Sequence, residues 1–158
     1  MSLPIAQSSA QQSVEPSAGF SSEWRVLSVH DGDTIRVRQG NRIERIRFAC
    51  IDAPELKQPL GKESRDFLKN LIAQGGDRVM LNIVDTDRYG RQVAEVFANG
   101  QLVQAQQVQQ GMAYVYQKYL SNCPAAGSVQ QAEAIAQQQR AGVWASNQQK
   151  PWEFRNSK

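Results

Sequence analysis

The sequence predicts a mixed α+β fold in which a small five-stranded β-barrel carries about three helices. Three observations predict this fold. Apolar and polar residues alternate through most of the first half of the chain, one helical segment separates the third predicted strand from the fourth, and two helical segments follow the fifth. The length of 158 residues suits one domain with a tail.

The first two strands lie on either side of an acidic break. Residues 24–29 alternate between apolar and polar and predict a strand, which Asp31-Gly32-Asp33 interrupts. Residues 34–38 predict the second strand, with Ile35 and Val37 on its core face. The break therefore places two carboxylates where one strand ends and the next begins.

A hairpin leads into the third strand. Gln39-Gly40-Asn41 lies between two β-patterned runs and predicts a tight turn, and residues 42–51 predict the strand that follows. The core face of that strand is marked by Ile43, Ile46, Phe48 and Cys50. Because Ile43 and Ile46 are out of phase for a regular strand, we expect a β-bulge near residues 44–45.

Helical periodicity appears in the rest of the chain. Phe67, Leu68, Leu71 and Ile72 form one apolar stripe and predict a helix over residues 61–73. The other predicted elements are strands over residues 78–84 and 91–97 and helices over residues 101–110 and 128–140. Five strands with a helix between the third and the fourth correspond to a closed Greek-key barrel of the OB type.

The two helices predicted near the C-terminus are rich in glutamine. Glutamine is a good helix former, and we interpret these residues as solvated helix faces. The last helix is predicted to begin at Ser128, which forms a capping-box pattern with Gln131 three residues later.

Composition and charge exclude several classes of protein. The chain has 18 basic and 15 acidic residues, and its net charge of +3 is compatible with a polyanionic partner. Two cysteines and one histidine exclude a dense disulfide scaffold, a four-cysteine zinc site and chemistry that needs a histidine pair. Whether Cys50 and Cys123 are two thiols or one disulfide is left open.

No apolar run approaches the roughly 18 residues of a membrane helix. The sequence has no heptads and no interface stripe, so we expect a monomer.

The two ends of the chain differ from the middle. Residues 1–22 are rich in Ser, Gln, Ala and Pro, and we expect them to form a disordered leader. They lack the basic start and apolar stretch of a complete signal peptide. A polar linker of this kind is common after an export signal or a lipid anchor, so we expect a secreted or cell-envelope protein, with the cytoplasm as the alternative. Residues 23–145 are expected to form the folded domain and residues 146–158 a C-terminal tail.

Charged residues gather at three predicted strand ends, where a rigid scaffold can present functional groups. The clusters are Asp31-Gly32-Asp33-Thr34, Arg47 with Asp52-Ala53-Pro54-Glu55, and Asp87-Arg88-Tyr89-Gly90-Arg91. Aspartates and a backbone carbonyl form an all-oxygen site that suits Ca²⁺, two arginines can bind phosphodiester oxygens bidentately, and a third carboxylate can accept a proton from water. The clusters therefore predict metal-assisted cleavage of phosphodiesters.

These motifs resemble the staphylococcal (micrococcal) nuclease, or thermonuclease, family. The matching segments are residues 29–34, 47–55, 87–91, 110–113 and 141–144, in the family's order and at similar spacing. The resemblance covers most of the chain from Trp24 to Trp144. It implies a Ca²⁺-dependent endonuclease that acts on DNA and RNA without sugar specificity, by attack of water on phosphorus, and leaves 3′-phosphate ends.

The resemblance also implies roles for individual residues. Asp33 and Asp52 correspond to metal ligands, the backbone carbonyl of Ala53 to a third ligand, and Asp31 to a group that supports the site. Arg47 and Arg91 correspond to the catalytic arginines and Glu55 to the proposed general base. The residues expected to contact substrate are Arg88, Tyr89 and Tyr116, the last chosen from three nearby tyrosines as a base-stacking ring.

The sequence departs from the family pattern at two places. Ala53 stands where the family has threonine, so a hydroxyl is lost although the carbonyl is kept. The segment from Glu55 to Gly61 is shorter than the corresponding family loop.

Two other functions compete with this interpretation. One is a catalytically inactive OB-fold module that binds nucleic acid or protein, although such modules typically lack the carboxylates and arginines present here. The other is a phosphatase of the haloacid dehalogenase type, suggested by Asp31-x-Asp33-Thr34 after a strand. That fold needs a helix and a parallel sheet next, whereas a hairpin follows here.

Overall fold

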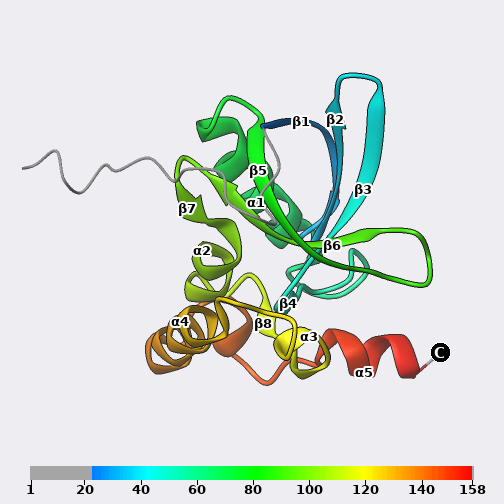
Figure 1. Cartoon of the computed structure of the whole chain (residues 1–158). Helices are drawn as coiled ribbons and strands as arrows, with labels where there is room; N and C mark the ends of the chain where they lie inside the picture. Colours follow the sequence, from blue (N-terminus) through cyan, green and yellow to red (C-terminus); the bar gives the residue numbers. More distant parts are fainter. Residues whose placement is uncertain (1–22, 158) are drawn as a thin grey trace, which may run out of the picture.

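The computed structural model describes residues 23–157, and the predicted leader lies outside these residues. Five strands form a closed barrel (Figure 1): β1 (Trp24–Asp31), β2 (Thr34–Gln39), β3 (Arg42–Phe48), β5 (Arg78–Thr86) and β6 (Gln92–Ala98). Neighbours in the order β3-β2-β1-β5-β6 pair antiparallel, and a parallel pairing of β3 with β6 closes the barrel. The predicted α+β fold with an OB-type barrel is confirmed.

Three short strands extend this plan. β7 (Gln101–Leu102) continues the sheet beyond β6, while β4 (Ile51–Asp52) pairs with β8 (Tyr114–Val115) in a separate two-stranded ladder. This small ladder lies at the end of the barrel where the helices gather (Figure 1). It fixes Asp52 opposite Tyr114.

Helices cover one end and one side of the barrel. They are α1 (Gly61–Gln74), α2 (Val103–Gln109), α3 (Gln117–Leu120), α4 (Ala126–Gln139), the 3₁₀ helix η2 (Gly142–Trp144) and α5 (Pro151–Asn156). The three predicted helices correspond to α1, α2 and α4, and the structure adds the three short ones. Helix α5 lies within the segment expected to be a tail, at the end of the molecule opposite the β2–β3 turn (Figure 1). No helix in the described part of the chain is long and apolar enough to cross a membrane.

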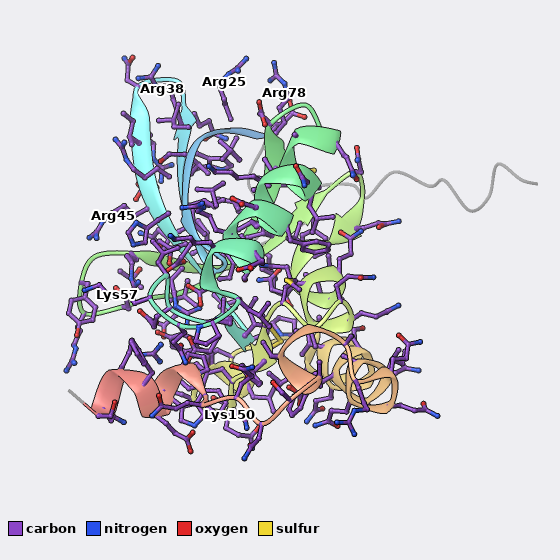
Figure 2. The ribbon with its side chains drawn as sticks, turned by 180° about the vertical axis from the view of Figure 1, so that it is seen from behind. Arg25, Arg38, Arg45, Lys57, Arg78 and Lys150 are labelled. Atoms are coloured by element: carbon purple, nitrogen blue, oxygen red, sulfur yellow. A yellow bond between two sulfur atoms is a disulfide. The ribbon has the colours of Figure 1, made fainter. Side chains whose placement is uncertain are left out.

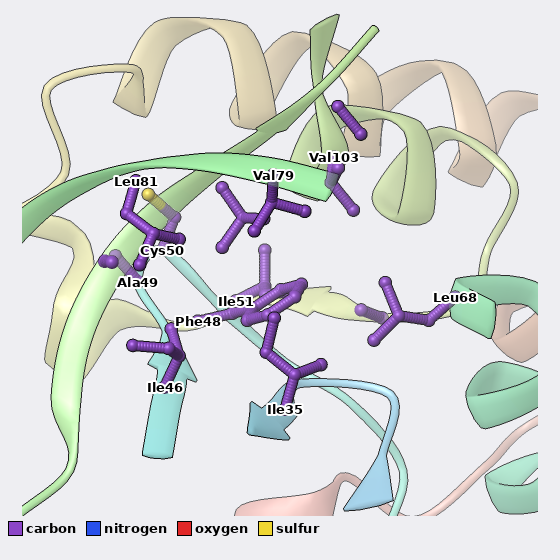
Figure 3. Close-up of a cluster of buried hydrophobic side chains, with 14 of the residues drawn as sticks. Ile35, Ile46, Phe48, Ala49, Cys50, Ile51, Leu68, Val79, Leu81 and Val103 are labelled. Carbon is purple, nitrogen blue, oxygen red and sulfur yellow. The ribbon is translucent and has the colours of Figure 1, made fainter. Parts of the chain in front are cut away.

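The core fills the barrel and continues towards the helices. Phe48, Ile46 and Ile35 point into the barrel together with Leu81 and Val79 (Figure 3), and each is almost completely buried. Their burial follows from the strand alternation, since Ile35 pairs with Ile46 across β2 and β3. The interior is therefore held by the apolar positions that the sequence pattern indicated.

The bulge predicted near residues 44–45 is wrong. The register between β2 and β3 runs without a shift from Gln39–Arg42 to Thr34–Arg47, and Ile43 points outward with 44% of its surface exposed. The change of phase occurs later, at Cys50, whose φ of 75° breaks the predicted strand into β3 and β4. The bend lets the chain leave the barrel and carry Asp52 to the small ladder.

The capping box predicted at Ser128 is also wrong. Helix α4 begins at Ala126, and Ser128 is an exposed residue of its first turn. The backbone N–H of Ala125 instead donates to the carboxylate of Glu95 at 2.8 Å. A buried acid on β6, distant in sequence, therefore satisfies a donor at the start of the helix.

Two positions near the core resolve other expectations. Cys50 and Cys123 form a disulfide that links the bend after β3 to the segment before α4. Gln104 and Gln107 of α2 are fully buried, so these two glutamines are not solvated. The side chain of Gln104 donates to the carbonyls of Ala49 and Ala94 at 3.2 and 3.0 Å and ties the bend to β6.

Candidate functional site

The predicted site residues gather in one open cleft of about 1180 Å³. The sequence-predicted residues that line it are Asp31, Asp33, Arg47, Asp52, Glu55, Arg88, Tyr89, Arg91 and Tyr116. Ala53 is buried beside the cleft and contributes its backbone. The cleft is built by the strand ends of β1 to β4, the β5–β6 turn, the segment around α3, and α5.

Two aspartates meet at the floor of the cleft. Asp33 accepts a hydrogen bond from the backbone N–H of Ala53 at 2.7 Å and another from the Thr34 hydroxyl at 3.1 Å. One nitrogen of Arg47, Nη2, lies 3.6 Å from Asp33 Oδ2 and 3.1 Å from Asp52 Oδ1. The two carboxylates therefore converge on one guanidinium, although 19 residues of sequence separate them.

Arg47 is largely committed to the protein itself. Its Nη1 donates to the carbonyls of Phe48 and Ile51 at 2.7 and 3.0 Å, and only 5% of the residue is exposed. Burial opposes the charged form, but the adjacent Asp33 and Asp52 carboxylates outweigh it and raise the pKa of Arg47. Arg47 is thus a fixed positive charge in contact with both carboxylates of the acidic pair.

The carboxylates of the cleft differ in their affinity for protons. Burial, followed by repulsion from Asp33, raises the pKa of Asp31 to about 8. Burial acts in the same direction on Asp33, but the Arg47 charge and the Ala53 N–H bond outweigh it and lower the pKa of Asp33. Burial raises the pKa of Asp52 to about 6 against hydrogen bonds from Arg155. Asp33 is therefore the carboxylate most firmly held in the charged form.

The β5–β6 turn holds Arg91 at the side of the cleft. Asp87 accepts hydrogen bonds from the backbone N–H groups of Tyr89 and Arg91 and from Arg91 Nε, the last at 2.7 Å. Burial alone would raise the pKa of the Asp87 carboxyl, but these hydrogen bonds and the Arg91 charge outweigh burial and lower it. Arg88 donates to the Tyr89 hydroxyl at 2.9 Å, and Arg45, labelled on β3 in Figure 2, donates to the Tyr89 carbonyl. The turn thus presents the Arg91 guanidinium and the ring of Tyr89, which is 59% exposed, to the cleft.

Aromatic rings line the opposite wall. Tyr116 stacks on Trp152 with 5.4 Å between ring centroids and 16° between planes, and it meets Tyr119 edge to face. The guanidinium of Arg47 lies 5.1 Å from the centroid of the Tyr119 ring. Tyr116 therefore lines the cleft, but one of its faces is covered by a ring from α5.

Arg155 is the main site residue that the sequence analysis missed. From α5 it donates to Asp52 Oδ1 and Oδ2 at 3.1 and 2.7 Å and to Glu55 Oε2 at 2.7 Å. Pro151 at the first helical position and Glu153 two residues later, whose carboxylate accepts from the Lys150 N–H at 3.0 Å, were the signals that could have indicated a helix here. No local pattern indicates that this helix reaches back across 100 residues.

The donors of the acidic pair fit a hard divalent cation, because Asp33, Asp52 and the adjoining backbone carbonyls offer only oxygen. Within the described residues, one group of three acidic, histidine or cysteine side chains has its ligand atoms within 4.8 Å of one another, namely Cys50, Glu95 and Cys123. Because both cysteines form the disulfide, that group holds no metal. The metal ligands expected from the sequence, Asp33 and Asp52, lie together at the floor of the cleft instead, each within 4 Å of Arg47 Nη2.

Comparison with known proteins gives a consistent result. The model of a family described as staphylococcal nuclease homologue matches residues 45–146. The chain is 40% identical over 136 residues to an uncharacterized endonuclease of Escherichia coli O157:H7. The matched residues make up 85% of this chain and 85% of that protein. It is 39% identical over 115 residues to a staphylococcal-like nuclease of Arabidopsis thaliana, 72% of this chain and 34% of that one.

Some relatives are much longer. An uncharacterized 38.1 kDa protein of Capnoides sempervirens is 36% identical over 136 residues, which is 85% of this chain and 37% of that protein. The chain therefore spans only about a third of the length of the two plant relatives described here. Helix α5 begins at Pro151, beyond the last residue matched by the family model.

Proposed function

Because the chain belongs to the staphylococcal nuclease homologue family, we propose that it is a nuclease, namely a Ca²⁺-dependent endonuclease that hydrolyses DNA and RNA to 3′-phosphate ends. The observation that carries the proposal is the convergence of two aspartates, Glu55 and two arginines in one cleft. Acids that can hold a cation and arginines that can bind a phosphate are the groups that phosphodiester hydrolysis needs.

Asp33 and Asp52 are the side chains that would hold the cation, together with the backbone carbonyl of Ala53. When bound, such an ion polarises a phosphoryl oxygen and offsets the negative charge that develops in the transition state. Asp31 supports this arrangement, because its carboxylate accepts from the backbone N–H of Asp33 at 3.1 Å. Ala53 lacks the hydroxyl of the threonine that the family has here, but the proposed ligand at this position is the backbone carbonyl, which alanine also provides.

Glu55 acts as the general base. It takes a proton from the attacking water, the water oxygen bonds to phosphorus, and the bond from phosphorus to the 5′ oxygen breaks. The departing 5′ oxygen takes up a proton from solvent water, and the phosphate stays on the 3′ side. Arg91 binds the phosphoryl oxygens through its outer nitrogens, and Arg47 contributes a fixed charge and its remaining N–H groups.

Substrate is held by the two walls of the cleft. Arg88 and Tyr89 contact phosphate or sugar from the β5–β6 turn, and Tyr116 offers a ring face on which a base stacks. Stacking tolerates any base, and the cleft is open, so the proposal is for cleavage of both DNA and RNA without strong sequence preference.

The test is digestion of plasmid DNA and of RNA, separately, in Ca²⁺, Mg²⁺ and chelator. We expect both polymers to be cut in Ca²⁺, with 3′-phosphate ends, and neither to be cut in chelator. Binding of nucleic acid without cleavage in any ion would instead indicate a binding module.

The disulfide supports a location outside the cytoplasm. Disulfides persist in the periplasm, on cell surfaces and in secreted proteins, and are rare in reducing compartments. A secreted or cell-envelope nuclease is therefore part of the proposal. Fractionation of cells that express the full chain checks it, since recovery in the cytoplasm with free thiols would contradict it.

A further inference from the structure

Helix α5 brings a third guanidinium into the acidic site. Arg155 forms a two-pronged contact with Asp52 and, through Nη1, also contacts Glu55 at 2.7 Å. Asp52 is completely buried in the protein, whereas the side chain of Arg155 is 35% exposed at the mouth of the cleft. The contact is therefore made from the solvent side, the side from which an ion and a substrate would enter.

The oxygens of Asp52 are nearly all taken. Oδ1 accepts from Arg47 and from Arg155, each at 3.1 Å, and Oδ2 accepts from Arg155 at 2.7 Å. A carboxylate offers about four lone-pair positions, so one is left. A divalent cation bound to Asp52 would also lie beside the positive charge of Arg155, which repels it.

We propose that Arg155 is a positioning residue that holds Asp52 and Glu55 together and competes with the divalent cation for Asp52. This inference rests on the proposed function. In the absence of the ion, the guanidinium supplies the positive charge that the buried carboxylate needs. When the ion binds, it replaces part of the Arg155 contact, so occupancy of the metal site is coupled to the docking of α5.

The rest of α5 is placed to allow this exchange. Trp152, one turn before Arg155, stacks on Tyr116, and Pro151 is buried, so the helix keeps an attachment that does not depend on Asp52. The guanidinium of Arg155 also lies 5.9 Å from the centroid of the Tyr116 ring. A guanidinium released from Asp52 therefore stays at the wall of the cleft.

The first measurement is thermal unfolding of the full chain, in chelator and in saturating Ca²⁺, for the wild type, Arg155→Gln and Arg155→Lys. Arg78→Gln is the matched control, because it removes an exposed arginine that pairs with Glu23 at 3.2 Å. Figure 2 shows Arg78 at the end of the molecule far from α5. Arg155→Gln should lower Tm in chelator, and Ca²⁺ should remove more than half of that loss. An equal loss in both conditions would mean that Arg155 only anchors the helix and would overturn the proposal.

The second measurement is the affinity for Ca²⁺ by calorimetry. Arg155→Gln should bind Ca²⁺ at least about tenfold more tightly than the wild type, because a nearby positive charge is removed. Arg155→Lys keeps the charge but not the fork, and should lie closer to the wild type. Unchanged or weaker binding by Arg155→Gln would overturn the proposal. If Arg155→Gln does not fold, Arg155→Lys, which loses the two-pronged contact with Asp52, must itself bind Ca²⁺ more tightly than the wild type, and equal or weaker binding would overturn the proposal.

DNA cleavage by the wild type in the same Ca²⁺ series separates the two proposals. Cleavage that depends on Ca²⁺, combined with no effect of Arg155→Gln on Ca²⁺ affinity, would leave the nuclease in place and reject the role of Arg155. If the wild type neither binds Ca²⁺ nor cleaves DNA, and Arg155→Gln gains no binding, both proposals fail.

Discussion

Arg91 is held through Nε by Asp87, and within the described residues its outer nitrogens have no hydrogen-bond partner. A guanidinium in this state can donate two parallel hydrogen bonds to a phosphate, whereas a lysine ammonium acts as a single charge. We therefore expect Arg91→Lys to lower kcat for DNA cleavage by on the order of 10²–10³, with the fold unchanged. Steady-state kinetics checks this, with the exposed Arg78→Lys as a control that keeps the wild-type rate. A loss of less than tenfold in Arg91→Lys would remove Arg91 from the reaction.

Asp87, in the turn that carries Arg91, makes the free energy of unfolding depend on pH. Its pKa is lowered in the folded protein, so its charged form stabilises the fold at any pH above the ordinary value for an aspartate. This contribution is lost as the pH falls through the lowered value. We expect Asp87→Asn to reduce the free energy of unfolding at pH 7 and the difference from the wild type to shrink in strong acid. Urea unfolding at several pH values measures it, and a difference that grows towards acid would contradict the sign.

At the scale of elements, the end of α2 and η2 are packed backbone against backbone. Gly111 has φ of +72°, and a Cβ there would lie 2.2 Å from the carbonyl oxygen of Ala141. Gly111→Ala should therefore destabilise the protein by clearly more than about 1 kcal/mol, since strain and clash act together. Gly76→Ala is the matched control, because Gly76 has φ of +70° but a Cβ there would meet no atom within 4 Å beyond its chain neighbours. Equal losses in the two variants, measured by urea unfolding, would show that the close approach contributes nothing.

Elements also show where reasoning from the sequence succeeds. Strand alternation identified Ile35 and Val37 as core residues, and both are fully buried, because a strand of period two has one face against the core. The same reasoning misplaced Ile43, because the strand has no bulge, so Ile43, three residues before Ile46, lies on the outer face. Ser128 failed as a cap because the helix begins before it, at Ala126, where the N–H of the preceding Ala125 donates to the remote acid Glu95. Sequence patterns therefore predicted correctly the features that strand alternation determines, and failed where a contact with a residue distant in sequence, or the absence of a bulge, determined the structure.

At the scale of the whole molecule, one covalent bond ties the barrel to the helices. The Cys50–Cys123 disulfide joins positions 73 residues apart. In the chain-entropy model a loop of this length stabilises the fold by about 4 kcal/mol. We expect a Cys50→Ala/Cys123→Ala variant to lose stability of this order and to unfold at lower urea concentration. If the variant unfolds at the same urea concentration as the wild type, the bond does not stabilise the fold.

The site shows the limit of sequence reasoning at this same scale. Three motifs were enough to indicate a cleft that contains Asp33, Asp52 and Arg91, because each motif lies at a strand end and resembles a family segment. Arg155 was not predictable, since its contact with Asp52 spans 103 residues and depends on how α5 folds back. Long-range contacts of charged side chains leave no periodic signal in a single sequence.

The central claim is that Asp33 and Asp52 hold a divalent cation that is needed for phosphodiester cleavage. The most direct measurement is the rate of plasmid cleavage by the wild type and by Asp52→Asn across a range of free Ca²⁺ concentrations. We predict a saturable dependence on Ca²⁺ in the wild type, no cleavage in excess chelator, and loss of cleavage by Asp52→Asn at every concentration. Wild-type cleavage that persists in chelator, or a full rate in Asp52→Asn, would contradict the account.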